Sequence, residues 1–453
     1  MTSTRPTSLL LPDPPISGPV TPAGRIVSSI RARARPGEDR VLRRVRTIWW
    51  LLFFNILGAA TNPVLHIPHK GGQALTQGAL VVALILALTI NPKVRIRPNA
   101  FLTVFTVLGV TALMSSIRLV SLGTDYRVFR LLAFIGVLWL LTPWWGRRDL
   151  LLLRAQVGFL VIIVCSVLLS LLVAHHTALG TGRLSGAIWP IPATQVAHYT
   201  AELTGLSIIL WASRLMRWRI ALLLAVPSFA FLLLTHTRTA LAAAGIGGLV
   251  AFVSLFTIRR RVRRAFTAFI LAIAFIGVPL SPLITSFLTR GQSPAQLSTL
   301  TGRTNFWGYV LAEHRTTFQT IFGDGISNGS INGQYFNGNL TAQSVDGLPI
   351  DSSWVEDYQD EGIAGDVLTG LMFVVLLVMA AFAPRGPRRA IALFLLIYCL
   401  FASITEDGAG IASQYAMDMT VAASLLVPEA VRRARRRRPR PLRPQLDPPP
   451  PWA

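Results

Sequence analysis

Long uninterrupted apolar runs constrain this chain more than any other feature. About twelve such runs lie between residues 47 and 428, and most approach the roughly 20 residues that an α-helix needs to cross a bilayer. Because apolar residues are continuous rather than alternating, an outer-membrane β-barrel is disfavoured. Hydrophobic residues make up 52% of the chain and charged residues 14%, against roughly 25% charged in soluble domains. The sequence therefore predicts an all-α, polytopic membrane protein of about 12 transmembrane helices. The expected spans are 47–61, 73–90, 99–117, 128–145, 155–174, 195–213, 218–235, 237–257, 265–286, 363–383, 389–405 and 408–428.

The net charge of +23 has a topological explanation rather than a nucleic-acid one. The 43 Lys and Arg residues gather in short clusters between the apolar runs and at both ends. With the N-terminus inside, most of them fall on one side, as the positive-inside rule requires. We therefore expect a multi-pass protein of the inner (cytoplasmic) membrane with both termini cytoplasmic. Membrane lipids are expected partners, and nucleic acid is not.

Cysteine and histidine spacing argues against disulfide and metal chemistry. The two cysteines, Cys165 and Cys399, each lie inside an apolar run and cannot form an extracytoplasmic disulfide framework. His175, His176 and His198 lie near one expected outer face, but their spacing gives little support for a metal site. The sequence predicts no metal and no cofactor.

One long loop breaks the pattern of short connections. The apolar runs leave about 76 residues, 287–362, between the ninth and tenth spans, and loops longer than about 15 residues are usually functional or disordered. This loop is rich in aromatic residues and contains "TGRTNFWGYVLAEH", which has helical spacing. We therefore expect a folded extracytoplasmic subdomain. The expected organisation is a disordered basic tail at 1–46, helices one to nine at 47–286, the loop at 287–362, helices ten to twelve at 363–428, and a basic Pro-rich tail at 429–453.

The acidic residues near the outer face have two possible roles. In "DSSWVEDYQDEGIAG" (351–365), most acids are expected to form a solvated collar, whereas Asp351 heads the segment. Asp351 would either cap the next helix or act as a general base. Glu406 and Asp407 fill a very short outer loop and are expected to form a turn.

Two further acids, Glu202 and Asp418, lie inside expected spans. Intramembrane acids are functional candidates because burying a charge is costly. The alternative is that each of these two acids pairs with an outer arginine.

Outer arginines are few, so each is a candidate. Arg238, after the tight turn "THT", would either snorkel to the interface or bind a phosphate. Arg303 would form a surface salt bridge or bind substrate, and Arg127 and Arg130 would anchor the fourth span or contribute to binding. Arg183, in "GTGRLSGAIWP", is a further candidate.

The order of these segments resembles the bacterial O-antigen ligase and O-antigen polymerase family. The string "RLSGAIWPIPATQVAHYTA" precedes "LLLTHTRTALAAA", and "GRTNFWGYVLAEHRTTFQTIFGDGISNG" precedes "DSSWVEDYQDEGIAG". The resemblance covers roughly residues 180–370 with short motifs, so their order carries the comparison. It implies a membrane glycosyltransferase of cell-envelope polysaccharide biosynthesis, which moves a glycan from a polyprenyl-pyrophosphate carrier to an acceptor hydroxyl without a metal.

The resemblance also implies roles for individual residues. Arg238 and Arg303, and less securely Arg183, match arginines thought to hold the leaving pyrophosphate. Asp351 stands where ligases have His, Ser352 where Asn is usual, and Thr237 where Ser is usual, so ligation and polymerisation both stay open. Asp351, Arg303 and Arg238 are therefore the expected catalytic residues. The expected substrate-binding residues are Arg183, Arg127, Arg130, Trp307, Trp354 and His198.

Two other functions compete with this interpretation. A transferase that uses a lipid-phosphate sugar donor would need acids in the first outer loop, but "TNPVLHIPHKGG" has none. A polysaccharide or lipid-linked glycan transporter (a flippase) fits the span count, although transporters usually show two similar halves and none are visible here.

Overall fold

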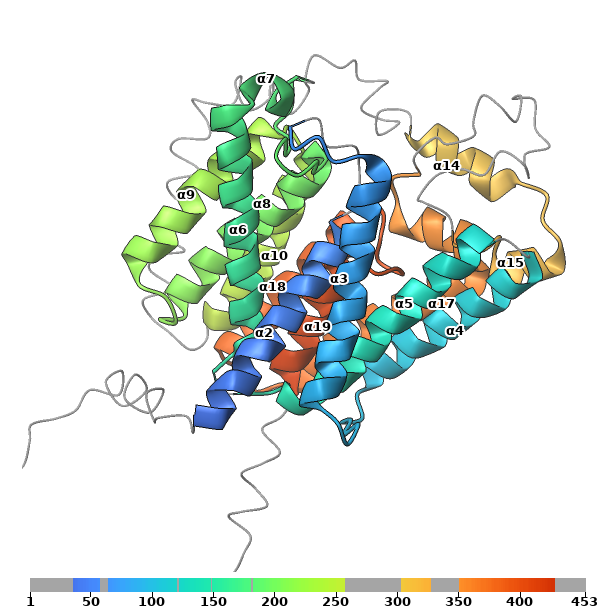
Figure 1. The fold of residues 1–453 in the computed structure, drawn as a ribbon, viewed down its shortest axis with the longest axis horizontal. Helices are drawn as coiled ribbons and strands as arrows, with labels where there is room; N and C mark the ends of the chain where they lie inside the picture. Colours follow the sequence, from blue (N-terminus) through green and yellow to red (C-terminus); the bar gives the residue numbers. More distant parts are fainter. Residues whose placement is uncertain are drawn as a thin grey trace, which may run out of the picture. The chain divides into compact units, whose positions relative to one another are not determined.

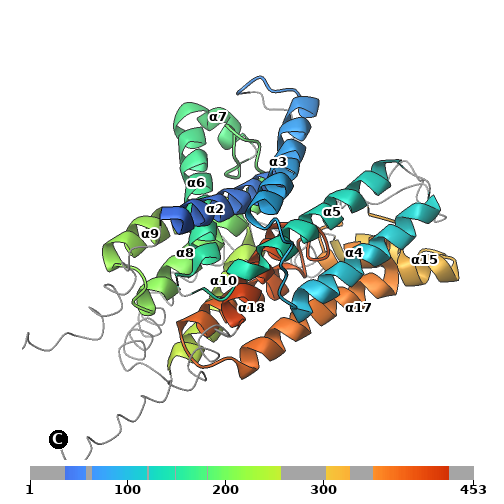
Figure 2. The same ribbon diagram turned by 60° about the horizontal axis from the view of Figure 1, so that its bottom comes forward.

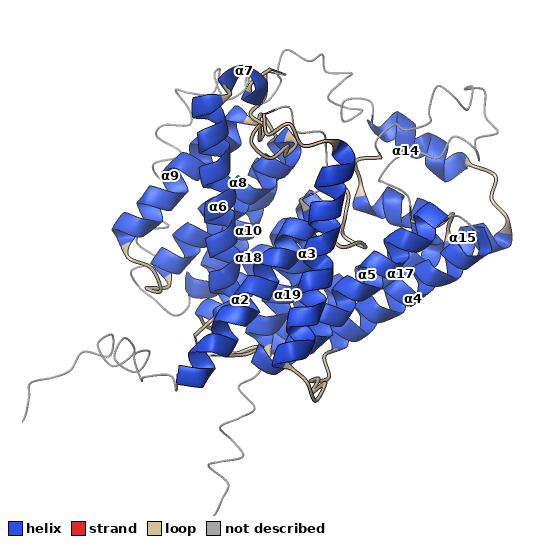
Figure 3. Cartoon of the chain, viewed as in Figure 1, coloured by secondary structure: helices blue, strands red, loops and turns tan. Residues whose placement is uncertain are grey.

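Every regular element in the described part of the chain is a helix. The computed structural model describes residues 36–57, 64–119, 122–147, 149–180, 182–256, 303–326 and 350–427. No strand occurs in these ranges (Figure 3), which confirms the expected all-α class. The helices are α2 (Pro36–Ile56), α3 (His69–Ile90), α4 (Ala100–Leu119), α5 (Leu122–Leu141), η1 (Thr142–Trp144), α6 (Leu151–Val173), α7 (His175–Ala178), α8 (Ala193–Ala212), α9 (Trp218–Leu234), α10 (Arg238–Phe256), α14 (Arg303–Ala312), α15 (Thr317–Phe322), α17 (Ser353–Phe382), α18 (Pro387–Ala402) and α19 (Gln414–Leu426).

Several of these helices are apolar enough to cross a membrane. Among the described residues, α3, α4, α5, α6, α10 and α17 have the required length and composition, which supports a membrane protein. Helix α8 is more polar because it carries His198, Glu202 and several hydroxyl groups, and α18 and α19 have only 16 and 13 residues. The ninth expected span, 265–286, lies outside the described residues.

The chain divides into two compact units, Met1–Arg43 and Arg44–Ala453, and the contacts described here belong to the second. Helix α10 packs along α18, α8 packs along α9, and α4 packs along both α5 and α17 (Figures 1 and 2). The α19 side chains from Tyr415 to Leu426 are all buried. A helix enclosed by other helices can carry polar groups on faces that would otherwise meet lipid.

The first helix starts earlier than the sequence suggested. Helix α2 begins at Pro36, so the expectation of a disordered tail through residue 46 is wrong for 36–46. Proline is favoured in the first turn of a helix. Glu38 and Asp39 lie in the same turn and complement the positive end of the helix dipole.

Three short segments between the apolar helices bear on the expected site. The expected break at "THTR" is confirmed, because α9 ends at Leu234 and α10 starts at Arg238, with His236 at φ +53° between them. The two helices do not pack along each other as a hairpin would, since α9 packs on α8 and α10 packs on α18. The expected loop helix is confirmed as α14. The segment from Ser403 to Ser413 joins α18 to α19.

Candidate functional site

Arg183 fixes the turn from which α10 begins. It lies between α7 and α8, and its Nε donates to the Thr235 carbonyl at 2.9 Å. Its Nη2 donates to Oγ1 of Thr237, also at 2.9 Å. The next residue, Arg238, is the first of α10. Two of the expected pyrophosphate-binding arginines therefore meet at one turn.

A chain of contacts leads from the same helix end to Arg303 and Asp351. Oγ1 of Thr405, in the α18–α19 loop, donates to Oγ1 of Thr239 at 2.7 Å. The Thr405 carbonyl accepts from Nη1 of Arg303 at 2.6 Å. Arg303 then pairs through Nη2 with Oδ2 of Asp351 at 3.1 Å, and the two side chains are 26% and 33% exposed. Residues from four separate segments are thereby linked, with the Arg303–Asp351 pair accessible to solvent.

Asp351 is held in an unusual backbone conformation. Its φ is +49°, a left-handed value that is uncommon outside glycine but tolerated best by Asp and Asn. Nε1 of Trp307 donates to the preceding Ile350 carbonyl at 2.8 Å. On the other side, the Ser353 N–H donates to the carbonyls of Ser403 and Glu406, each at 3.0 Å. These contacts fix the backbone around Asp351.

Asp351 does not cap the next helix, so this alternative is wrong. The N-cap of α17 is Ser352, and neither it nor Asp351 forms a side-chain cap. The reason is geometric, because Asp351 turns toward Arg303 instead of toward the helix. The carboxylate therefore pairs with Arg303 and not with the start of the helix.

Glu406 is the residue that the sequence analysis missed. Its side chain is 6% exposed, and Arg303, Asp351 and Arg183 all lie close enough to affect its ionisation. Burial raises the pKa of Glu406 to about 8, and Arg303 opposes this effect. The polar break "TED" between two apolar runs was visible in the sequence, but no spacing rule places it beside Arg303.

The acids of 356–361 are buried, so the predicted solvated collar is wrong. Glu356, Asp357, Asp360 and Glu361 are each only 1–2% exposed. The cause is a sharp bend in α17 at Gly362, where φ is +67°. A Cβ on Gly362 would lie 2.5 Å from the Ile321 carbonyl carbon, so glycine is required for this approach.

The bend folds the start of α17 back onto the rest of that helix. Trp354 packs against Phe373, with ring centroids 6.3 Å apart, and also approaches Gly370. In a straight helix these residues would be more than 20 Å apart at about 1.5 Å per residue. Trp354, an expected sugar-covering residue, is therefore part of this packing.

Arg127 and Arg130 on α5 lie in other surroundings. Nη1 of Arg127 donates to the Ile326 carbonyl at 3.0 Å, and the side chain interacts electrostatically with Asp360. Arg130 donates to the Asn55 side chain at 3.3 Å and to its carbonyl at 3.1 Å. Both arginines thus link separate segments of the fold.

His198 is buried in α8 between two tyrosines. Its Nδ1 is hydrogen-bonded to the hydroxyl of Tyr398, and its Nε2 lies 3.3 Å from the hydroxyl of Tyr415. Tyr415 in turn interacts electrostatically with Glu406. One tyrosine therefore separates His198 from the cluster.

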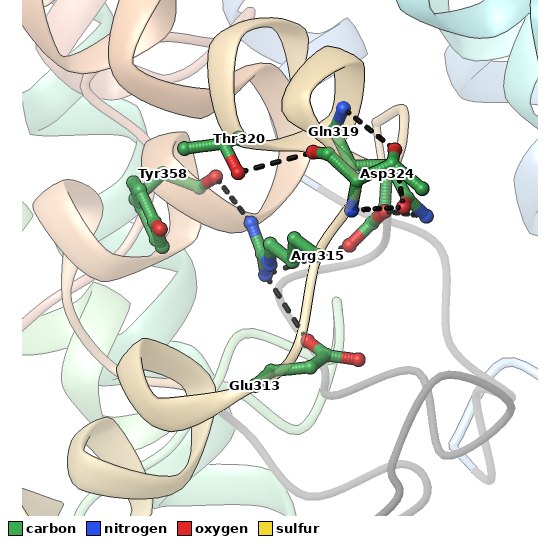
Figure 4. Close-up of polar contacts among 7 residues, drawn as sticks. Glu313, Arg315, Gln319, Thr320, Asp324 and Tyr358 are labelled. Atoms are coloured by element: carbon green, nitrogen blue, oxygen red, sulfur yellow. Dashed lines mark hydrogen bonds and ion pairs between the residues drawn. The ribbon is translucent and has the colours of Figure 1, made fainter.

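A second charged cluster, centred on Arg315, joins the segment from Glu313 to Asp324 to α17 (Figure 4). Nη1 of Arg315 donates to the Tyr358 carbonyl at 2.9 Å, and Nη2 lies 3.3 Å from Glu313 and 3.4 Å from Asp324. The Arg315 side chain is 3% exposed. Burial raises the pKa of both Glu313 and Asp324, and Arg315 opposes the rise. No sequence signal singled out this cluster.

A polar network surrounds the two acids of the helix core. Nε2 of Gln156 donates to Oε1 of Glu202 at 2.8 Å and also to Asp418. Gln414 donates to the other oxygen of Glu202 at 2.9 Å, and Cys399 lies 3.8 Å from the other oxygen of Asp418. The alternative that each acid pairs with an outer arginine is wrong, because neutral side chains occupy both carboxylates.

We call Arg183, Arg238, Arg303, Asp351 and Glu406 the outer cluster, after the face on which the sequence predicted them. This cluster has the chemistry of an anion-binding site beside carboxylates. Fixed guanidinium groups hold phosphate oxygens well, and Asp351 and Glu406 are candidate proton acceptors. Among the described residues, no group of His, Cys, Asp and Glu has the arrangement of a metal site. No protein-family model matches the chain, and a search of curated proteins finds no match.

Proposed function

We propose that this protein is a membrane glycosyltransferase of the O-antigen ligase or polymerase type. It moves a glycan from a polyprenyl-pyrophosphate carrier to an acceptor hydroxyl on the extracytoplasmic face. The observation that carries the proposal is a chain of contacts that joins Arg183, the start of α10 at Arg238, Arg303 and Asp351. These residues were selected from the sequence, and they come from segments up to about 170 residues apart.

The cluster suits a reaction in which pyrophosphate leaves. As the bond from the sugar to the phosphate breaks, negative charge grows on the leaving group, and preorganised cations stabilise it. Hydrogen bonds to Thr235, Thr237 and Thr405 already orient the guanidinium groups of Arg183 and Arg303. Little reorganisation is then needed when the donor binds.

The proposed topology completes this assignment. We place twelve spans in the inner membrane, both termini in the cytoplasm, and 287–362 outside, so that the cluster faces the extracytoplasmic side. Donor, acceptor and membrane lipids are the partners, and the reaction needs no metal or nucleotide.

The test compares the lipid-linked glycan pool of a deletion strain with that of the complemented strain by mass spectrometry. Single repeat units accumulating on the carrier would identify a polymerase, and long stranded chains would identify a ligase. Arg303→Lys should restore less than a tenth of the wild-type flux, because an ammonium cannot reproduce the guanidinium geometry. The matched control is Arg217→Lys, at an exposed position distant in sequence from Arg303. It should restore the wild-type flux fully. An unchanged pool in the deletion strain would refute the proposal.

A transporter of lipid-linked glycan is the alternative. The observation that favours it is the buried pair Glu202 and Asp418, since acids inside membrane helices often form transport pathways. If the protein is a transporter, its deletion should leave the carrier-linked glycan chemically unchanged but confined to the inner leaflet. Leaflet-specific labelling of the same pool therefore separates the two functions.

A further inference from the structure

Asp351 and Glu406 lie beside the same arginine in different bonding states. Oδ2 of Asp351 is occupied by Arg303 at 3.1 Å. The Glu406 carboxylate, in contrast, has no hydrogen-bond donor among the described residues and interacts with its neighbours only electrostatically. One acid is committed to orienting a guanidinium, and the other is uncommitted.

The backbone of Glu406 is nevertheless fixed. Its carbonyl accepts from the Ser353 N–H at 3.0 Å and from Oγ of Ser353 at 2.8 Å. The neighbouring Thr405 carbonyl is held by Arg303. A side chain without a hydrogen bond on a fixed backbone can bond to an incoming group without breaking an existing contact.

We propose that Glu406, rather than Asp351, accepts the proton of the acceptor hydroxyl, and that Asp351 positions Arg303. This inference rests on the proposed glycosyl transfer. In the step, the acceptor oxygen forms a bond to the anomeric carbon while its proton passes to the Glu406 carboxylate. The bond between that carbon and the phosphate oxygen breaks, and polyprenyl pyrophosphate leaves with the electron pair. The proton then passes from Glu406 to solvent, which restores the carboxylate.

The electrostatic surroundings suit this role. Burial raises the pKa of Glu406 to about 8, and a general base works best when its pKa lies near the operating pH. The charged and titratable groups that face it come from five elements and the same loop: Arg303 from α14, Asp351 ahead of α17, Arg183 ahead of α8, Tyr398 from α18, Tyr415 from α19 and Asp407 from the loop. Below pH 8 the carboxyl is increasingly protonated, so the transfer rate should rise with pH up to about 8.

The test uses full-length protein in proteoliposomes made from the envelope extract of the deletion strain, which contains the carrier-linked glycan and its acceptor. Release of polyprenyl pyrophosphate is measured from pH 5 to 9. Glu406→Gln should lower the rate at least 100-fold, a typical contribution of general-base catalysis. Asp351→Asn should lower the rate but keep the rising limb of the pH profile. Asp39→Asn, which changes an exposed acid in the first turn of α2, is the control and should change neither.

Binding of undecaprenyl pyrophosphate separates the possible failures. Glu406→Gln should bind it within twofold of the wild type. If wild-type protein neither binds this probe nor releases polyprenyl pyrophosphate, the proposed function fails. If wild type transfers and Glu406→Gln keeps the rate and the rising limb, this inference is overturned. Loss of the limb in Asp351→Asn would instead make Asp351 the base. Should Glu406→Gln not fold, Glu406→Asp should retain a rising limb at a lower rate, and an unchanged rate there would also overturn the inference.

Discussion

The core network and the outer cluster treat carboxylates in opposite ways. In the core, Glu202 and Asp418 bond to each other and to the side chains of Gln156, Gln414 and Cys399, and both acids are fully buried. In the outer cluster, Asp351 is partly exposed and paired with a cation, and Glu406 has no hydrogen-bonded partner among the described residues.

This difference in the partners of the carboxylates indicates which region can bind a ligand. Buried polar groups that are satisfied by neutral donors tie helices together and fix a unique packing. Partly exposed charges on loop ends contribute little to stability, but they can bind an incoming anion. We therefore expect substitutions in the core network to reduce stability and those in the outer cluster to reduce transfer.

The Arg315 cluster separates the effect of charge from the effect of burial, and it should give the largest change in stability. It is charged like the outer cluster but buried like the core (Figure 4). Arg315→Met should cost about 3–5 kcal/mol of unfolding free energy, because it leaves Glu313 and Asp324 buried without their cation. The measurement is unfolding in mixed detergent micelles, with exposed Arg217→Met as the control.

The same variant has a defined pH dependence. The pKa of Glu313 and of Asp324 is raised by burial and held down in part by Arg315, so both should rise further in Arg315→Met. When the pKa of a carboxyl is higher in the folded than in the unfolded state, the free energy of unfolding falls as pH rises through the folded-state pKa. The deficit should therefore be small in acid and grow toward neutral pH. A loss under about 1 kcal/mol at pH 7 would show that exposure, not burial, governs this cluster.

Gln156→Met should give the next largest change, about 2–3 kcal/mol. The substitution keeps the side-chain volume but removes the donor to both Glu202 and Asp418 and the acceptor for Trp49. Leaving buried polar groups unsatisfied costs roughly 1–3 kcal/mol each. The control is Gln73→Met on an exposed position of α3. If Gln156→Met were fully stable but inactive in transfer, the core network would belong to the functional site.

Much of the architecture was predictable because it depends on local patterns. Long continuous apolar runs predicted the helical class, and "THTR" predicted the tight turn before Arg238. Motif order then selected Arg183, Arg303 and Asp351 as candidates that meet in space. The contacts between these residues could not be predicted, because they join segments far apart in the sequence.

The errors arose where tertiary contacts override local patterns. The acids after Asp351 look like a solvated collar, since nothing in "WVEDYQDEG" reveals that α17 folds back at Gly362 and buries them. Glu406 looks like part of a turn, because its importance comes from Arg303, about 100 residues earlier. Burial of a charged residue depends on distant segments, and sequence periodicity does not report it.

Arg303→Ala tests the difference between the core network and the outer cluster most directly, and we expect it to change stability least. The Arg303–Asp351 pair is about a quarter to a third exposed, and such pairs contribute about 0.2–1 kcal/mol. The bond to the Thr405 carbonyl adds little, because water can replace Arg303 there. We expect a loss below about 1 kcal/mol in the same micelle assay, together with a loss of transfer of at least 100-fold. Asp351→Asn, measured alongside, should be equally mild in stability, since it breaks the same pair. A loss of more than about 2 kcal/mol in either variant would place this pair with the structural network of the core, and the separation between the two regions would fail.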